Sequence, residues 1–352
     1  MSTLVQISVL PRQQEDTSFI LELALQKAKL HGIDIKDWRI RKRSIDARRV
    51  PIKINLQVEF WLQNEQKEAI PAFIAQDVSS KKEIAIIGAG PAGLYAALRA
   101  IEAGLKPIVF ERGKDVRARR RDLAIINKEQ TVNPESNYCF GEGGAGTYSD
   151  GKLYTRSKKR GNVLKAIEWF VHFGADPDIL VDAHPHIGTN KLPKIITAMR
   201  EAIIAAGGEV HFNAKMTDIT LKDNTITGLQ INDTNTYSFS NVILATGHSA
   251  RDIFYLLHKK DIAIEAKPFA IGVRVEHQQE LIDTIQYHGD GENPYLPPAS
   301  YALVEQVDGL GVYSFCMCPG GIIAPCATSQ KEVVTNGWSP SKRNNPYANS
   351  GI

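Results

Sequence analysis

The stretch "EIAIIGAGPAGLYAALRAIEAGLKPIVFERG", residues 83–113, decides the fold of this chain. Its apolar residues at 84–87 predict a buried strand, and the alanine-rich run at 91–104, which follows a glycine turn, predicts a helix. A second apolar run at 107–110 predicts another strand. Strand, helix and strand in this order form the crossover unit of a parallel sheet, so we predict an α/β fold with a Rossmann-like, doubly wound domain.

The glycines of this stretch have the spacing of a dinucleotide-binding turn. Gly88, Gly90 and Gly93 match GxGxxG, in which glycine allows the tight turn, the approach of the backbone to a pyrophosphate, and close packing of helix on strand. Glu111 follows the second strand, where a carboxylate accepts hydrogen bonds from a ribose and disfavours a 2′-phosphate. GxGxxG alone also fits a crossover without a ligand, but strand, glycines, helix and acid in register predict a dinucleotide site.

The chain as a whole has the composition of a globular protein. Its 352 residues suffice for two or three domains, and its 43% hydrophobic and 23% charged residues argue against disorder. The net charge of +3 implies no polyanionic partner, and the four cysteines are expected to be reduced. The N-terminus has no signal-peptide pattern and no run approaches the roughly 18 apolar residues of a membrane span, so we expect a cytoplasmic protein without a membrane partner.

The predicted elements divide the chain into three domains. Residues 1–80 are expected to form a small α+β domain with the order strand, helix, strand, strand, its helix starting at Asp16 or Thr17 and stopping at Gly32. Residues 81–261 are expected to form the doubly wound domain, and residues 262–352 a partial substrate or cap domain.

Further elements are predicted within the second and third domains. The doubly wound domain is expected to add a series of short strands between residues 209 and 247, with a β-meander before residue 241, and helices at 114–130, 161–173 and 191–206. Thr189 or Asn190 is the expected cap of the last of these helices. In the third domain, "FAIGVRVEH" and "GVYSFCMC" predict strands, whereas residues 336–352 show neither periodicity nor a packing face.

Two motifs carry a resemblance to a known superfamily. "GAGPAG" followed by "ERG" resembles the two-dinucleotide-binding-domain flavoproteins, and "NVILATG", residues 241–247, is similar to their second FAD motif. The resemblance implies an FAD-binding domain with FAD as cofactor and places the backbone of Met216 against the adenine ring. The residues it implies for the cofactor are Gly88, Gly90, Pro91, Ala92, Gly93, Glu111, Arg112, Gly143, Gly144, Ala145, Gly146, Met216, Ala245, Thr246 and Gly247.

A glycine-rich loop strengthens the resemblance. In "GEGGAGTYSDGK", Gly141, Gly143, Gly144 and Gly146 suit a loop that covers the pyrophosphate and flavin, although such a loop also serves as a plain surface connection. Together with "FAIGVRVEH", the motifs resemble one group, the uncharacterised FAD-dependent dehydrogenases, or NAD(P)/FAD-dependent oxidoreductases, over nearly the whole chain. The resemblance implies an FAD-dependent oxidoreductase whose substrate, a small molecule or a protein, is unknown.

The chain also departs from the superfamily pattern. The last residues contain no Gly-Asp pair for the ribityl chain of the flavin, so we expect a truncated protein that binds substoichiometric FAD. No second GxGxxG unit provides a separate nicotinamide domain. NADH or NADPH is therefore expected to act, if at all, as a transient electron donor, with another protein or the substrate itself as the alternatives.

Five residues are candidates for catalysis, and the sequence does not choose among them. His248 follows the second FAD motif and suits a general acid or base. Arg274 and His277 offer charge to a reduced flavin or a substrate carboxylate, or else lie on an exposed strand face. Cys316 and Cys318 suit electron transfer near a flavin, but their CxC spacing on one strand face favours two buried small hydrophobic residues.

The remaining polar clusters have simpler interpretations. His184 and His186 lack a third ligand and are expected to be structural, so we predict no metal site. The basic run at 39–49 favours a solvated strand face, with RNA binding as the rival, and nucleic acid is not an expected partner. In the basic run at 116–122, one arginine is expected to reach the pyrophosphate. The rival functions are an RNA-modifying flavoprotein and a non-catalytic FAD-binding scaffold.

Overall fold

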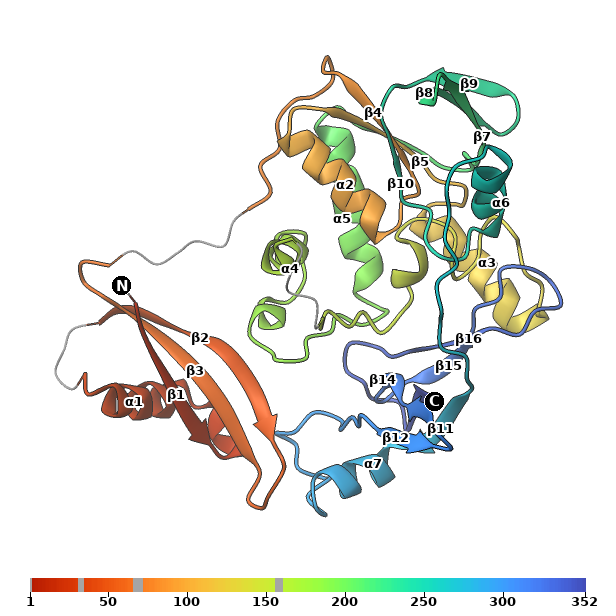
Figure 1. Ribbon diagram of the computed structural model, residues 1–352. Helices are drawn as coiled ribbons and strands as arrows, with labels where there is room; N and C mark the ends of the chain where they lie inside the picture. Colours follow the sequence, from red (N-terminus) through yellow and green to blue (C-terminus); the bar gives the residue numbers. More distant parts are fainter. Residues whose placement is uncertain (1, 31–34, 66–71, 156–160) are drawn as a thin grey trace.

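The computed structural model describes residues 2–30, 35–65, 72–155 and 161–352. Figure 1 shows three groups of elements, with the N-terminal sheet and helix at the lower left, the parallel sheet and its helices above, and the C-terminal strands at the lower right. In the described residues, no helix is both long and apolar enough to cross a membrane.

The N-terminal group is a three-stranded antiparallel sheet with one helix. It consists of β1 (Thr3–Val9), the 3-10 turn η1 (Pro11–Glu15), α1 (Thr17–Ala28), β2 (Ile35–Asp46) and β3 (Lys53–Leu62), with the strand order β1-β3-β2. Asp16 caps α1 by accepting a hydrogen bond from the Phe19 amide at 2.9 Å. The element order is the predicted one, whereas the predicted helix stop at Gly32 lies outside the described residues.

The central group is the predicted α/β fold. The strands β4 (Glu83–Ile87), β5 (Lys106–Phe110), β6 (Glu209–His211) and β10 (Val242–Leu244) form a parallel sheet in the order β10-β4-β5-β6. Four helices follow or connect these strands in the first part of the domain, α2 (Pro91–Glu102), α3 (Val116–Glu129), α4 (Val163–His172) and α5 (Leu192–Ala205). The predicted doubly wound fold class is therefore confirmed.

The two faces of the parallel sheet bury different cores. Ile86 and Val109 face a cluster with residues of α2, α4 and α5, whereas Ile87 and Phe110 face a cluster with Met216 and other residues of the meander. The alternation follows from the pleat of each strand, which turns successive side chains to opposite faces. The meander consists of β7 (Met216–Lys222), β8 (Thr225–Ile231) and β9 (Asn235–Ser238), and α6 (Arg251–Lys259) packs on the same side.

One helix start differs from its prediction. The first residue outside α5 is Lys191, which makes no side-chain cap hydrogen bond, so the expected cap at Thr189 or Asn190 is wrong. The side-chain oxygen of Asn190 instead accepts a hydrogen bond from the amide of Ser341 at 2.8 Å. The side chain of Asn190, which the local sequence predicted to cap the helix, therefore makes a tertiary contact with the C-terminal group instead.

The C-terminal group is built from short strands and one helix. Its elements are β11 (Arg274–Gln278), α7 (Gln279–Gln286), β12 (Val304–Val307), β13 (Leu310–Tyr313), β14 (Phe315–Cys318), β15 (Ile322–Pro325), β16 (Thr335–Trp338) and β17 (Tyr347–Gly351). The strand predicted in "FAIGVRVEH" begins only at Arg274, and the one predicted at 311–318 is divided between β13 and β14.

The prediction that residues 336–352 have no packing face is wrong. They contain most of β16 and the whole of β17, which is the middle strand of the sheet β11-β17-β14. Asn349 and Ser350 are fully buried, and their side chains hydrogen-bond to Arg274 and to the Phe315 carbonyl. A strand whose buried positions are small and polar has no apolar alternation, so its pattern was invisible to sequence analysis.

A buried carboxylate joins the C-terminal group to the central one. Asp150, which is 1% exposed, accepts hydrogen bonds from Ser339 and from Arg343 at 2.9 Å, and pairs with Lys152 at 2.9 Å. Burial raises the pKa of Asp150, but the charges of Arg343 and Lys152 outweigh burial and hold the pKa at about 2. The end of the glycine-rich loop is thereby fixed to the C-terminal strands.

Candidate functional site

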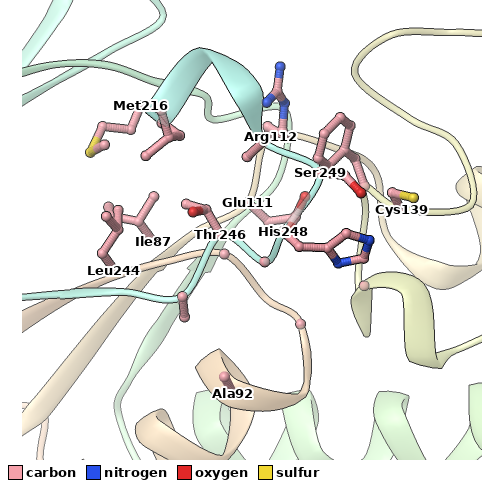
Figure 2. Close-up of a pocket in the computed structure, with 18 of the residues that line it drawn as sticks. Ile87, Ala92, Glu111, Arg112, Cys139, Met216, Leu244, Thr246, His248 and Ser249 are labelled. Carbon is pink, nitrogen blue, oxygen red and sulfur yellow. The ribbon is translucent and has the colours of Figure 1, made fainter. Parts of the chain in front are cut away.

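A cavity of about 610 Å³ opens where the carboxyl ends of β4 and β10 meet. This edge of a parallel α/β sheet is where ligands bind in doubly wound folds. Figure 2 shows Ile87, Leu244 and Met216 on one side of the cavity and Arg112, Ser249 and Cys139 on the other. The other residues that line it are Gly88, Gly90, Pro91, Ala92, Phe110, Glu111, Phe140, Gly144, Ala145, Gly146, Ala214, Lys215, Ala245, Thr246, Gly247, His248, Ala250, Ile253 and Phe254.

The N-terminus of α2 faces this cavity without a cap. Gly90 is the residue before the helix and offers no side chain to its first amides. Pro91 occupies the first helical position, where a missing N–H costs nothing, and Ala92 and Gly93 have no intrahelical acceptor for their amides. The helix dipole adds positive potential at this end, so the cavity contains a preformed site for an anion.

The three glycines of the turn differ in what a side chain at each position would contact. A Cβ on Gly93 would lie 1.8 Å from the Gly88 carbonyl oxygen, and one on Gly88, whose φ is +102°, would lie 2.5 Å from the oxygen of Ala245. Both glycines are therefore required by packing. A Cβ on Gly90 meets only the Gly144 Cα at 3.8 Å, and its φ of −72° suits any residue, so nothing in the protein itself demands glycine there.

Glu111 organises the turn around the cavity. Its Oε2 accepts the Ala89 amide at 2.8 Å, and its Oε1 accepts the amides of Gly113 at 2.8 Å and Gly141 at 3.0 Å. The carboxylate, 5% exposed, still lines the cavity. Because an ionised carboxylate offers about four acceptor positions, Oε2 retains one for a ribose hydroxyl. Sequence analysis predicted the sugar contact but not the three backbone contacts.

The glycine-rich loop packs against the helix start. The Gly143 amide donates to the Ala89 carbonyl at 2.7 Å, and a Cβ on Gly144 would approach the Gly90 Cα to 3.2 Å. Gly144, Ala145 and Gly146 line the cavity, whereas Gly93 and Gly143 lie behind it.

A fully buried arginine holds this loop in place. Arg119 of α3 donates to four carbonyl oxygens between residues 137 and 144, at 2.8 to 2.9 Å. The sequence prediction placed one arginine of the run 116–122 at the pyrophosphate. Arg119 instead lies behind the loop, outside the cavity lining. Because the glycine-rich loop forms no α-helix or strand that would satisfy these carbonyls, the guanidinium supplies their hydrogen-bond donors.

Arg112 belongs to an ion-pair network at the cavity wall. It donates to Glu135 at 2.7 Å and Asp252 at 2.9 Å, and its guanidinium lies 4.2 Å from the centre of the Phe140 ring. Lys215 pairs with the same two carboxylates at 2.9 and 3.5 Å. Burial lowers the pKa of Arg112, but the hydrogen bonds and charges of the two carboxylates outweigh it and raise the pKa, so the side chain is fixed and cationic.

The second motif closes the other side of the cavity. The Ala245 amide continues from β10 with a hydrogen bond to the Ile87 carbonyl at 2.8 Å, which brings Thr246 and Gly247 beside the first turn. Gly247 has a φ of +71° and no neighbour at its Cβ position. His248 and Ser249 line the cavity next to it.

Four of the five catalytic candidates lie outside the cavity lining. Arg274 hydrogen-bonds to Asn349 and the Cys316 carbonyl, and His277 to the Tyr301 hydroxyl at 2.7 Å. Cys316 and Cys318 lie on β14. Only His248 among the candidates lines the cavity. Residues that sequence analysis did not assign to the cavity also line it, notably Phe110, Cys139, Phe140, Lys215, Ser249, Ile253 and Phe254.

The basic run at 39–49 is largely neutralised. Arg39 and Arg41 pair with Glu59, Arg43 with Asp178 and Asp182, and Arg48 with Asp46. Because these arginines already have carboxylate partners, the run offers less positive charge to a polyanion than its sequence implies. In the described residues, no group of three or more His, Cys, Asp or Glu side chains is arranged to hold a metal ion.

Comparison with known proteins defines the class of the chain. Residues 83–121 match the family model described as an FAD binding domain, and residues 268–352 match the one described as FAD-dependent protein, C-terminal domain-like. Residues 1–61 match a domain of unknown function. These matches place the protein in the class of FAD-dependent proteins, and the resemblance seen in its sequence is confirmed.

The relatives place the chain within this class. It is 38% identical to an uncharacterised protein of Clostridium beijerinckii over 96% of this chain and 66% of that protein. A probable fumarate reductase of Shewanella frigidimarina is 25% identical over 76% of this chain and 50% of its own length. The chain belongs to the family of FAD-dependent proteins whose C-terminal domain it carries at residues 268–352.

Solved structures give a more distant likeness. A glycine oxidase from Bacillus cereus is 18% identical, covers 52% of this chain and 59% of its own, and superposes with a TM-score of 0.29. The chain spans about two thirds of the Clostridium relative and half of the Shewanella relative. The activity and substrate of a whole protein of this family are therefore matters for proposal.

Proposed function

We propose that the cavity between β4, α2 and β10 holds FAD and that the protein uses it to exchange a hydride or electrons with an unidentified small molecule or protein. The uncapped start of α2 would hold the diphosphate, with Gly90 giving the backbone room to approach it. Glu111 would hold the adjoining ribose, and the second motif, from Ala245 to Gly247, would close the site. The flavin supplies the redox chemistry when it is bound.

The observation that carries this proposal is the open position at Gly90. Its backbone accepts any residue and its Cβ position is free, yet glycine stands there at the mouth of an uncapped helix. Glycine is conformationally costly unless something needs the space, and a diphosphate against the first amides of α2 needs it. Glycines retained for packing, such as Gly93, show the opposite geometry.

The protein's own groups set the surroundings of the reacting atoms. The apolar side chains of Ile87, Phe110 and Met216 exclude water from the part of the cavity on the meander side. We assign His248, which lines the cavity, as the residue available for proton transfer to a substrate. Arg274 and His277 are held by structural hydrogen bonds and are given no catalytic role.

The test is reconstitution of the 352-residue protein with FAD, followed by anaerobic addition of NADH and of NADPH in separate experiments. The visible flavin spectrum should appear in the protein fraction, and bleaching by one nicotinamide would identify the donor. Stoichiometric flavin without reduction by either nicotinamide points to a protein or substrate donor. A protein that takes up no FAD from excess cofactor would refute the proposal.

A further inference from the structure

A second cluster of reactive side chains lies away from the cavity. β14 carries two free thiols, of which Cys316 is exposed and Cys318 is fully buried. Neither lines the cavity proposed for FAD. The expectation of two buried small hydrophobic residues is therefore wrong for Cys316, because its side chain reaches solvent.

The backbone at this cluster is irregular. Cys316 has a φ of +48°, and the register of β14 against β17 shifts between Phe315 and Cys318. A left-handed conformation is uncommon for residues other than glycine, asparagine and aspartate, and residues held in it concentrate at functional sites. The irregularity takes Cys316 out of the ladder of the sheet and presents it at the surface.

The two cysteines interact with each other and with a lysine. The Cys318 thiol donates to the Cys316 carbonyl oxygen at 3.3 Å, so its side chain points back along the strand. Lys152 Nζ lies 3.3 Å from the Cys318 sulfur and 2.9 Å from a carboxylate oxygen of Asp150. Arg274 Nη1 lies 3.3 Å from the Cys316 carbonyl oxygen.

These neighbours shift the pKa values of the two thiols in opposite directions. A hydrogen bond from the Cys318 thiol lowers the pKa of Cys316, and the charges of Lys152 and Arg274 lower it further against the opposing effect of burial. The same hydrogen bond and burial raise the pKa of Cys318. Asp150 raises the pKa of Cys318 as well, while Lys152 opposes that effect. A cationic, partly exposed setting of this kind is where reactive thiolates occur.

We propose that Cys316 and Cys318 form a redox-active dithiol that is oxidised by low-molecular-weight disulfides, with Cys316 as the attacking thiolate and Cys318 as the resolving thiol. The Cys316 sulfur attacks one sulfur of a disulfide RSSR, forms a mixed disulfide and releases RS⁻. Cys318 gives its proton to that RS⁻ and attacks the Cys316 sulfur, which releases the second RS⁻. The protein loses two electrons to RSSR, and the Cys316–Cys318 disulfide forms.

The lysine has a defined part in the second step. As Cys318 loses its proton, negative charge develops on a sulfur that lies 3.3 Å from Lys152 Nζ. The ammonium group stabilises that charge and so makes the buried thiol available as a nucleophile. The site does not depend on bound flavin, because none of its residues lines the cavity.

The test treats the purified 352-residue protein with oxidised glutathione, followed by acid quenching, alkylation of the remaining thiols and mass spectrometry of the peptide that contains both cysteines. The parent protein should form the internal disulfide. Cys318→Ser should accumulate a mixed disulfide with glutathione at Cys316, and Cys316→Ser should leave Cys318 unmodified. Lys152→Gln should slow closure of the internal disulfide about tenfold, the effect of roughly one pKa unit on the Cys318 thiolate population.

Cys139 and Cys326 serve as internal controls in the same digest, because they are free thiols outside the cluster. Thermal unfolding of each variant checks the fold, and Cys318→Ala is the second trapping variant, since serine leaves a hydroxyl at a fully buried position. The proposal is overturned if Cys316 reacts no faster than Cys139, or if both Cys318 variants are folded and neither traps glutathione.

Discussion

The replacement Gly90→Ala tests whether glycine is needed at this position for ligand binding or for the stability of the fold. The backbone at Gly90, with φ −72° and ψ −178°, suits alanine, and the new methyl group would meet only the Gly144 Cα at 3.8 Å. Reduced freedom of the unfolded chain contributes about 0.4–1 kcal/mol of stability. At the position before a helix, alanine stabilises the protein less than glycine does, by a free energy of similar size. The two effects offset each other, so the free energy of unfolding should change by less than about 0.5 kcal/mol.

The same methyl group should weaken FAD binding strongly. It occupies the space through which a diphosphate approaches the first amides of α2, and loss of one hydrogen bond to a charged group costs about 1.5–3 kcal/mol. That cost corresponds to a tenfold to roughly hundredfold rise in Kd. Titration of the apoprotein with FAD, followed by flavin fluorescence, measures the affinity, and urea denaturation of the apoprotein measures the stability.

Two other glycines provide the controls for this experiment. Gly311→Ala makes the same chemical change on β13, where only a side-chain nitrogen of Gln306 lies within 4 Å, and should leave FAD affinity unchanged. Gly93→Ala places a methyl 1.8 Å from the Gly88 carbonyl oxygen and should disrupt folding itself. If Gly90→Ala binds FAD as tightly as the parent protein, the diphosphate does not lie at α2 and the reasoning about the site is refuted.

Three further predictions concern the groups that hold the site. Glu111→Gln replaces one carboxylate oxygen by an amide donor, which must face either the Ala89 amide or those of Gly113 and Gly141, so it should cost about 1–3 kcal/mol in urea unfolding; an unchanged midpoint would contradict that. Arg119→Met removes a donor from each of four loop carbonyls, of which those of Glu142 and Gly144 keep a hydrogen bond from Thr147, so it should cost about 3 kcal/mol or more and expose residues 139–152 to limited proteolysis, whereas a protected loop would contradict its clamping role. The pKa of Asp150 falls from 3.8 to about 2 in the folded protein, so its contribution to stability is present above about pH 4 and lost as the pH falls toward 2. Asp150→Asn should remove that part of the acid dependence of unfolding, and an acid profile identical to that of the parent protein would contradict it.

The parts of the molecule that the sequence predicts well are those governed by local rules. The crossover unit at 83–113 has strong apolar periodicity, a helix with proline at its first position and glycines at fixed spacing, and all of these act within about thirty residues. Gly88 and Gly90 were assigned to the site by this local spacing, whereas the second motif at 245–247, far along the chain, was assigned to the same site by its resemblance to the FAD motif of the superfamily. The structure places the two motifs together because β10 and β4 are parallel neighbours that end at one edge of the sheet.

The parts that the sequence does not predict depend on partners distant in the chain. Arg119 looks like one more charge in a basic run, and only the fold shows that it is fully buried against the glycine-rich loop. β17 lacks an apolar pattern because polar hydrogen bonds, rather than hydrophobic contacts, fill its buried positions. Cys316 was assigned to a regular strand face, but its positive φ removes it from that face. Patterns of hydrophobicity carry no signal for any of these features.

The contacts of the glycine-rich loop indicate how the C-terminal strands matter to a cavity that they do not line. The residues that line the cavity all lie between positions 87 and 254, so the central group alone forms its walls. Arg119 holds the near end of the loop from within that group, whereas Asp150 fixes the far end through Ser339 and Arg343. The Cys139 thiol also donates to the Cys326 carbonyl at 3.7 Å, which ties a cavity residue to the C-terminal strands. Since a glycine-rich loop has high conformational entropy, two anchors limit its freedom more than one. If the cavity holds FAD as proposed, the C-terminal strands contribute to its binding by ordering the loop, and a change that loosens them should weaken FAD binding without altering any residue that lines the cavity.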